Sequence, residues 1–139
     1  MKRWLAVVGG ASPMRSLFGS GSDRAPSLSE LAGDAIGFVV AYAYTAFGHL
    51  QPSLVARVLG GFWVARVLRE RPSWMVPYSL AVAAGGTLFE AGLSSTGAFR
   101  YHHPDFLGVP IWLPGIYLHC ALFAGSLHVL LVGQSQRAR

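Results

Sequence analysis

Charged side chains are scarce in this 139-residue sequence, which has 12% charged and 53% hydrophobic residues. A soluble domain carries about 25% charged residues. The scarcity therefore argues against a soluble domain and favours an integral membrane protein. The formal net charge is +5, but Lys and Arg form no dense patch and instead flank apolar segments. This distribution argues against nucleic-acid binding and is typical of membrane topology.

Cysteine is almost absent, and the common catalytic motifs are missing. The single cysteine, Cys120, excludes an internal disulfide and a cysteine-based zinc site, and its apolar surroundings favour a small core residue. The sequence has no nucleophile motif, no Gly-rich phosphate loop, and no H-x-x-x-H or E-x-x-H pattern. We therefore expect no metal site and no cofactor.

What the sequence does contain is four apolar segments. They cover about Leu31 to Leu50, Ser53 to Leu68, Trp74 to Phe99, and Val109 to Gly133. A membrane-spanning helix needs about 20 residues, which the first and fourth segments provide, and the third is long enough to tilt. Arg57 and Arg66 interrupt the second, but both lie near its ends, where their stems can reach the headgroups. The sequence predicts an all-α, polytopic helical membrane protein with about four transmembrane helices.

The N-terminal 29 residues differ in composition, being rich in Gly, Ser and Arg. They predict a flexible tail, with a signal peptide or an organellar transit segment as alternatives. Residues 30–135 form the predicted four-helix transmembrane domain, whose first helix takes Ser27 or Ser29 as its N-cap and Glu30 in its first turn. Four spans place nine Lys and Arg residues on one side, and Arg57 and Arg100 on the other. The positive-inside rule then puts both termini in the cytoplasm.

Glu90 is the sharpest single feature of the third segment. It lies about 13 Å from the Phe99 end of the predicted helix, close to the middle of a hydrocarbon core of about 30 Å. An acid there must be paired, protonated, or face protein or water. It is therefore either a ligand anchor or proton site, or an acid tied to a neighbouring helix. Small and polar residues share its stripe, which predicts a close packing face or a cavity wall. These residues are Ser79, Ala83, Gly86, Ser94 and Gly97.

The loop before the fourth segment is predicted to be rigid. Pro104 fixes a turn, and Asp105 is placed to cap the entry of a short helix or re-entrant segment. Tyr101 and Trp112 suit a membrane interface. His102 and His103 are adjacent, so their side chains diverge on an extended chain and do not form a chelating pair. The predicted structural residues of this loop and of the helix start are Tyr101, Pro104, Asp105, Phe106 and Pro114.

The stretch "YHHPDFLGVPIWLPGIY" resembles a known family signature, Y-x-x-P-D-F-L followed by W-L-P-x-I. This is the signature of the insulin-induced-gene (Insig) proteins and their bacterial homologues. Residues 50–71 and 86–101 are similar to the fourth and fifth spans of that family. The resemblance implies a non-enzymatic protein of the bacterial inner membrane or the endoplasmic reticulum, with cytosolic termini. It also implies a diacylglycerol-like or sterol-like ligand and a trimeric homo-oligomer.

Three departures from the family pattern matter. The family has six spans, whereas four fit here, so the open side of an Insig-like bundle predicts a homo-oligomer or a partner chain. Leu68 stands where animal members carry an Asp needed for partner binding. Glu90 stands where they carry a neutral polar residue, so its role is not transferred from the family.

The polar stripe and the family loop together predict a site for a membrane lipid within the helical bundle. Its residues are Tyr42, Thr45, Glu90, Ser94, Trp112 and His119. Two alternatives remain open. One is a small membrane enzyme or isomerase in which Glu90 and His119 act as acid and base on a lipophilic substrate. The other is a structural subunit that packs through the Gly-rich faces of the second and third segments.

Overall fold

A computed structural model describes residues 27–47, 50–69 and 73–137 of the chain. Within these ranges the protein is all-helical, which confirms the predicted class. Its elements are α2 (Leu28–Tyr44), the short 3₁₀ helix η1 (Thr45–Phe47), α3 (Pro52–Val67), α4 (Met75–Ser95) and α5 (Leu113–Arg137). The described residues contain no strand beyond one isolated bridge between Phe106 and Val109.

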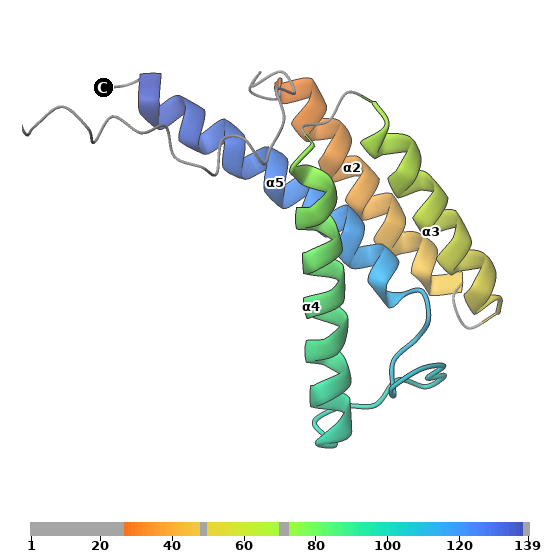
Figure 1. Cartoon of the computed structure of the whole chain (residues 1–139). Helices are drawn as coiled ribbons and strands as arrows, with labels where there is room; N and C mark the ends of the chain where they lie inside the picture. Colours follow the sequence, from red (N-terminus) through yellow and green to blue (C-terminus); the bar gives the residue numbers. More distant parts are fainter. Residues whose placement is uncertain (1–26, 48–49, 70–72, 138–139) are drawn as a thin grey trace, which may run out of the picture.

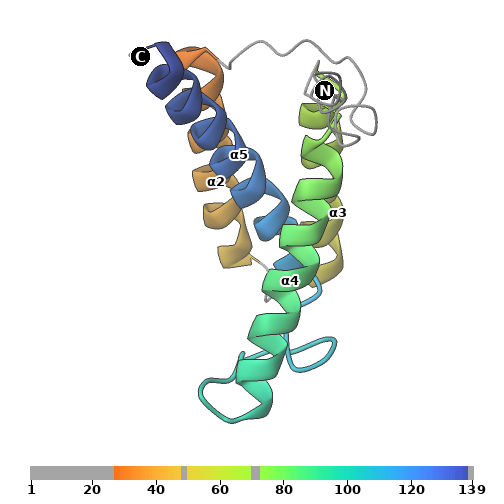
Figure 2. The same cartoon turned by 60° about the vertical axis from the view of Figure 1, so that its left-hand side comes forward.

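Helix α5 is the centre of the bundle, because α2, α3 and α4 each pack against it. Successive helices run in opposite directions, so the start of α2 and the end of α5 lie at the same end of the molecule (Figures 1 and 2). The loop between α4 and α5 lies at the opposite end. Only the last three residues of the predicted tail are described, and they already form the start of α2.

The start of α2 is explained directly by its sequence. The Ser27 hydroxyl accepts a hydrogen bond from the Glu30 N–H, and the Glu30 carboxylate accepts one from the Ser27 N–H. This reciprocal capping box confirms Ser27 as the N-cap and stabilises the helix by about 0.5–2 kcal/mol. Pro52 in α3 and Pro114 in α5 occupy first-turn positions, where a missing N–H breaks no helical bond.

Glycines allow α3 and α4 to approach α5 closely. A Cβ atom on Gly86 would lie 2.5 Å from the Tyr117 ring, and one on Gly115 would lie 2.7 Å from Leu59. Ser79 and Ala83 on the same stripe of α4 are buried. Of the two alternatives for this stripe, the structure supports the close packing face.

Among the described residues, α5 is the one helix long and apolar enough to cross a membrane, over Leu113–Ser135. Helices α2 and α3 have 17 and 16 residues, and each carries two charged residues within it. Helix α4 has 21 residues but is rich in Gly, Ser and Thr. The structure therefore gives four helices, of which one has the length and composition of a transmembrane span.

Candidate functional site

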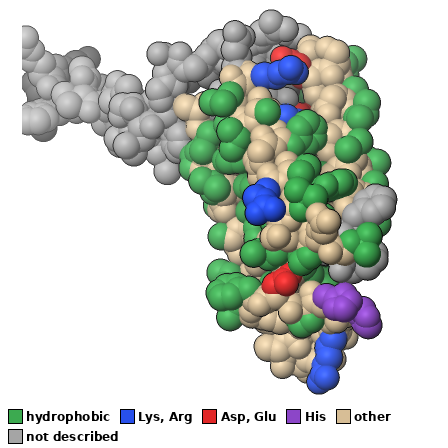
Figure 3. Space-filling view, turned by 90° about the vertical axis from the view of Figure 1, so that its right-hand side faces the viewer, with side chains coloured by type: hydrophobic (Ala, Val, Ile, Leu, Met, Phe, Trp, Pro, Cys, Tyr) green, Lys and Arg blue, Asp and Glu red, His purple; other side chains and the backbone are tan. Residues whose placement is uncertain are grey.

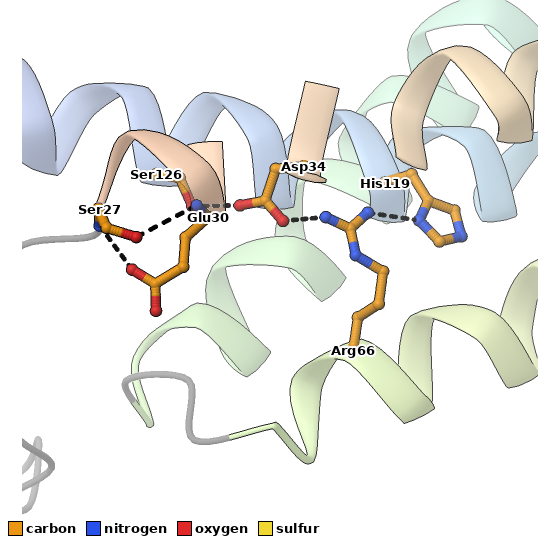
Figure 4. A network of polar contacts seen from close by, with 6 residues as sticks. All are labelled: Ser27, Glu30, Asp34, Arg66, His119 and Ser126. Atoms are coloured by element: carbon orange, nitrogen blue, oxygen red, sulfur yellow. Dashed lines mark hydrogen bonds and ion pairs between the residues drawn. The ribbon is translucent and has the colours of Figure 1, made fainter. Parts of the chain in front are cut away.

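Two polar clusters lie on different sides of α5. The first, called here the Arg66 network, consists of Asp34, Arg66, His119 and Ser126 (Figure 4). Arg66 reaches from α3 to form an ion pair with Asp34 on α2, and Ser126 on α5 donates a hydrogen bond to the second oxygen of Asp34. Asp34, His119 and Ser126 are fully buried, and the Arg66 side chain is 10% exposed. A charged pair thus links three helices inside the bundle.

The hydrogen bonds of His119 fix its tautomer. Its Nε2 atom lies 3.1 Å from the carbonyl oxygen of Leu59, which can only accept, so Nε2 carries the proton. Its Nδ1 atom lies 3.3 Å from Nη1 of Arg66, which can only donate. His119 is therefore a neutral imidazole that bridges the guanidinium and the backbone of α3. The guanidinium also lies 5.6 Å from the centroid of the Phe62 ring, within cation–π range.

A small residue makes room for this ion pair. Asp34, Gly37 and Ala41 form the buried stripe of α2, at the i, i+3, i+7 spacing of one helix face. A Cβ atom on Gly37 would collide with the Arg66 guanidinium. Gly37, about one turn after Asp34, therefore leaves the space that the Arg66 guanidinium occupies.

The prediction that Arg66 reaches outward to the headgroups was wrong. Arg66 turns inward, because Asp34 offers a buried partner of opposite charge. Arg57, about two and a half turns earlier on α3, is exposed. Sequence reasoning missed Asp34 and Ser126 altogether. The signal was present, since an acid inside an apolar segment demands a partner by the same argument that was applied to Glu90.

The second cluster, called here the Glu90 site, consists of Glu90, Tyr101 and Tyr117. Tyr101 from the loop and Tyr117 from α5 each donate a hydrogen bond to one carboxylate oxygen of Glu90, which is half-buried on α4. Burial raises the pKa of Tyr101, and its hydrogen bond to Glu90 raises that pKa further. The Tyr101 hydroxyl therefore stays a hydrogen-bond donor throughout the physiological pH range.

The loop between α4 and α5 is tied to the Glu90 site. Ser94 donates to the Gly108 carbonyl at 3.2 Å, and the Tyr101 and Trp112 rings meet edge to face with centroids 6.4 Å apart. The Asp105 carboxylate accepts the Ile111 N–H at 3.0 Å, just before α5 begins. Asp105 was predicted to cap the entry of a short helix or re-entrant segment, and in the structure it instead holds the loop two residues before α5.

The six predicted ligand residues divide unevenly between the two clusters. Glu90, Ser94 and Trp112 lie at or beside the Glu90 site, and Tyr42 is close enough to Tyr101 to contribute electrostatically to its raised pKa. Thr45, the first residue of η1, donates its hydroxyl to the Tyr42 carbonyl oxygen at 2.6 Å and forms no hydrogen bond with the described residues of either cluster.

His119 belongs to the Arg66 network instead. Tyr117 and His119 are two residues apart on α5, so their side chains project about 200° apart around the helix axis. Tyr117 faces Glu90, and His119 faces α3. The structure therefore does not bring Glu90 and His119 together as an acid–base pair. No group of three or more metal-ligating side chains gathers within the described part of the chain.

No protein-family model, curated protein or solved structure matches this chain. The Insig resemblance stays a prediction based on the loop residues.

Proposed function

We propose that this protein is a non-enzymatic integral membrane protein with four spans, which binds a neutral, hydroxyl-bearing lipid at the Glu90 site. The lipid class is diacylglycerol-like or sterol-like. The termini lie on the cytoplasmic side, and the loop between α4 and α5 on the opposite side.

The observation that carries the membrane placement is the apolar outer surface of the bundle. Asp34, Ser79, His119 and Ser126 are fully buried within an otherwise apolar core. Large apolar side chains are outside, and several are more than half exposed, among them Ile36, Val39, Val40, Leu88 and Phe89. Figure 3 shows hydrophobic groups spread over the face that α3 presents, with few charged side chains between them. The helices of a soluble bundle present polar side chains to the solvent, whereas a lipid-facing surface requires apolar ones.

Helix direction and length support four spans. The helices alternate in direction, with the start of α2 and the end of α5 at one end, as an even number of spans requires (Figure 1). Helices α2 and α3 are about 25 Å long and α4 is about 31 Å long, against a hydrocarbon core of about 30 Å. The ion pair between Asp34 and Arg66 removes the two most costly charges of α2 and α3 from contact with lipid.

The chemistry of the Glu90 site favours a neutral lipid with a hydroxyl group. A carboxylate offers about four lone-pair positions, and Tyr101 and Tyr117 each use one. A lipid hydroxyl can donate to a remaining position. A phosphate headgroup has no such proton to offer and would meet a carboxylate of like charge. Phe89, exposed and adjacent to Glu90 on α4, provides apolar surface for the lipid chains.

Native mass spectrometry of the protein in a mild detergent with added dioleoylglycerol tests this function. We expect a stoichiometric dioleoylglycerol adduct on the wild-type protein. In Glu90→Gln the apparent affinity should fall about 10- to 100-fold, because a hydrogen bond to a charged group contributes about 1.5–3 kcal/mol.

Glu30→Gln is the matched control, because it makes the same chemical change at the exposed capping box and should bind dioleoylglycerol like the wild type. Dioleoylphosphatidylcholine, which has the same acyl chains and a phosphate but no hydroxyl group, provides the headgroup control and should bind less well. A wild-type protein that takes up no dioleoylglycerol, or takes up both lipids equally, would contradict the proposed ligand class.

A further inference from the structure

The tip of the loop between α4 and α5 displays apolar side chains that are about half exposed or more. Phe106, Leu107 and Ile111 are 65%, 57% and 49% exposed. Phe106 and Val109 exchange backbone hydrogen bonds of 3.0 Å, which close a tight turn around Leu107 and Gly108. The turn brings the three exposed side chains to one end of the molecule.

Leu107 is held in a backbone conformation that does not suit leucine. Its φ is +50° and that of Gly108 is +78°, the left-handed values that a tight hairpin turn of this kind requires at both central positions. Asn or Gly adopts such values readily, whereas a left-handed residue with an ordinary side chain costs roughly 1–2 kcal/mol. Leu107 is therefore unfavourable for the turn itself. A role for its exposed side chain in contacting a partner would explain why leucine stands at this position.

The turn is held rigidly enough to present these side chains. Asp105 donates its N–H to the Val109 carbonyl at 3.1 Å and accepts the Ile111 N–H at 3.0 Å. Ser94 on α4 donates to the Gly108 carbonyl. The tip is thus fixed to α4 and to the loop segment that leads into α5.

The position and charge of the tip identify the partner. The apolar stretch of α5 begins at Leu113, two residues after Ile111, so the tip lies at the depth where that stretch begins. Arg100, His102 and His103 are exposed on the same loop. The one acid of residues 96–112 is Asp105, whose carboxylate is engaged by a backbone N–H. Figure 3 shows histidine and cationic side chains next to each other at one end of the molecule.

We propose that Phe106, Leu107 and Ile111 insert into the adjoining leaflet of the membrane and anchor the loop there, with Arg100 facing anionic phospholipid headgroups. An apolar tip beside a cation is the combination that an interface of acyl chains and anionic headgroups binds. The inference rests on the membrane placement of the proposed function. It makes the loop a second lipid contact that differs in chemistry from the Glu90 site.

Spin labels in nanodiscs of phosphatidylcholine and phosphatidylglycerol test the insertion. The single cysteine is removed by Cys120→Ala, and labels are placed through Leu107→Cys, His103→Cys or Val39→Cys, with Phe106→Cys as a second tip position. Collision with oxygen reports acyl chains, and collision with a water-soluble nickel chelate reports solvent. We expect the tip positions to collide more with oxygen and His103 more with nickel, and the tip label to move deeper as the phosphatidylglycerol fraction rises.

The label at Val39 on α2 tests the membrane placement of the bundle separately from the anchoring of the loop tip. Val39 is suitable because it is exposed on the apolar face of the bundle. Oxygen collisions at Val39 together with nickel collisions at both tip positions would overturn the anchor while leaving the membrane bundle in place. A tip shielded from both reagents would overturn it in favour of a covering protein chain. Nickel collisions at Val39 would overturn the membrane bundle, and the anchor with it.

Discussion

Arg66 is the residue on which the buried polar contacts of the bundle converge. It pairs with Asp34, meets His119 and lies over Phe62. The same helix carries Arg57 in an exposed position, so α3 contains both an inward and an outward arginine. The difference arises from a partner 32 residues away in sequence, not from anything in the local composition of α3.

Removing Arg66 should destabilise the protein far more than removing Arg57. Arg66→Met leaves the Asp34 carboxylate buried without its counter-charge, which we expect to lower the free energy of unfolding by about 3–5 kcal/mol. Arg57→Met should change it by no more than about 0.5 kcal/mol. Thermal unfolding in detergent, followed by circular dichroism, measures both.

The double variant Arg66→Met with Asp34→Leu completes the test. Because it removes both charges together, it should recover most of the stability that Arg66→Met loses. Equal effects of Arg57→Met and Arg66→Met, or no recovery in the double variant, would argue against a buried ion pair.

Tyr101 gives a prediction in alkaline solution. Burial, followed by the hydrogen bond to Glu90, raises its folded-state pKa above the ordinary value of 10.0. Its contribution to stability is therefore fully present below pH 10 and is lost as pH rises through the folded-state pKa. Ultraviolet titration should show late phenolate formation, with one tyrosine fewer titrating late in Tyr101→Phe. Stability should also fall less steeply above pH 10 in that variant, and identical pH profiles would contradict the assignment.

At the scale of helices, the contact of α4 with α5 depends on the absence of one side chain. Tyr117 lies over Gly86 and reaches on to Glu90, so helix packing and the geometry of the Glu90 site share one residue. Adjacent Gly85 has no heavy atom within 4 Å of the position where a Cβ would lie. The two neighbouring glycines therefore form a matched pair for experiment.

Gly86→Ala should destabilise the bundle, whereas Gly85→Ala should not. The new methyl group at position 86 would lie 2.5 Å from the Tyr117 ring, an overpacking that typically costs about 1–3 kcal/mol. At position 85 the higher helix propensity of alanine should leave stability unchanged or raise it by about 0.5–1 kcal/mol. Unfolding midpoints of both variants in the same detergent provide the comparison. Equal midpoints would show that α4 and α5 do not meet through Gly86.

At the scale of the whole molecule, the sequence was sufficient for the parts that depend on local pattern. The four apolar segments became helices with ends shifted by a few residues, Ser27 and Glu30 formed the predicted cap, and Glu90 found partners on a neighbouring element. The pairing of Asp34 with Arg66 and Ser126 could not be found in this way. These residues are 32 and 92 positions apart, and only the rotation of three helices about their axes brings them together.

The same limit explains why His119 was grouped with Glu90. Both residues lie at similar depth in neighbouring segments, but depth does not determine which way a side chain faces. In the structure, the rotation of α5 directs Tyr117 toward Glu90 and His119 toward α3. Sequence periodicity and the free-energy cost of burying a charge therefore identified which residues need polar partners. The packing of the helices determined which partners they have.

The most direct test of the four-span bundle is labelling of intact cells with a membrane-impermeant maleimide. Single cysteines are introduced in the Cys120→Ala background at Gln51, Ser73, His103 and Ser135, which lie at the two ends of the bundle. The four-span arrangement predicts labelling of positions 51 and 103 in intact cells, and of positions 73 and 135 only after permeabilisation. Labelling of 51, 73 and 103 alike, with 135 protected, would mean that α5 alone crosses the membrane and would contradict the account.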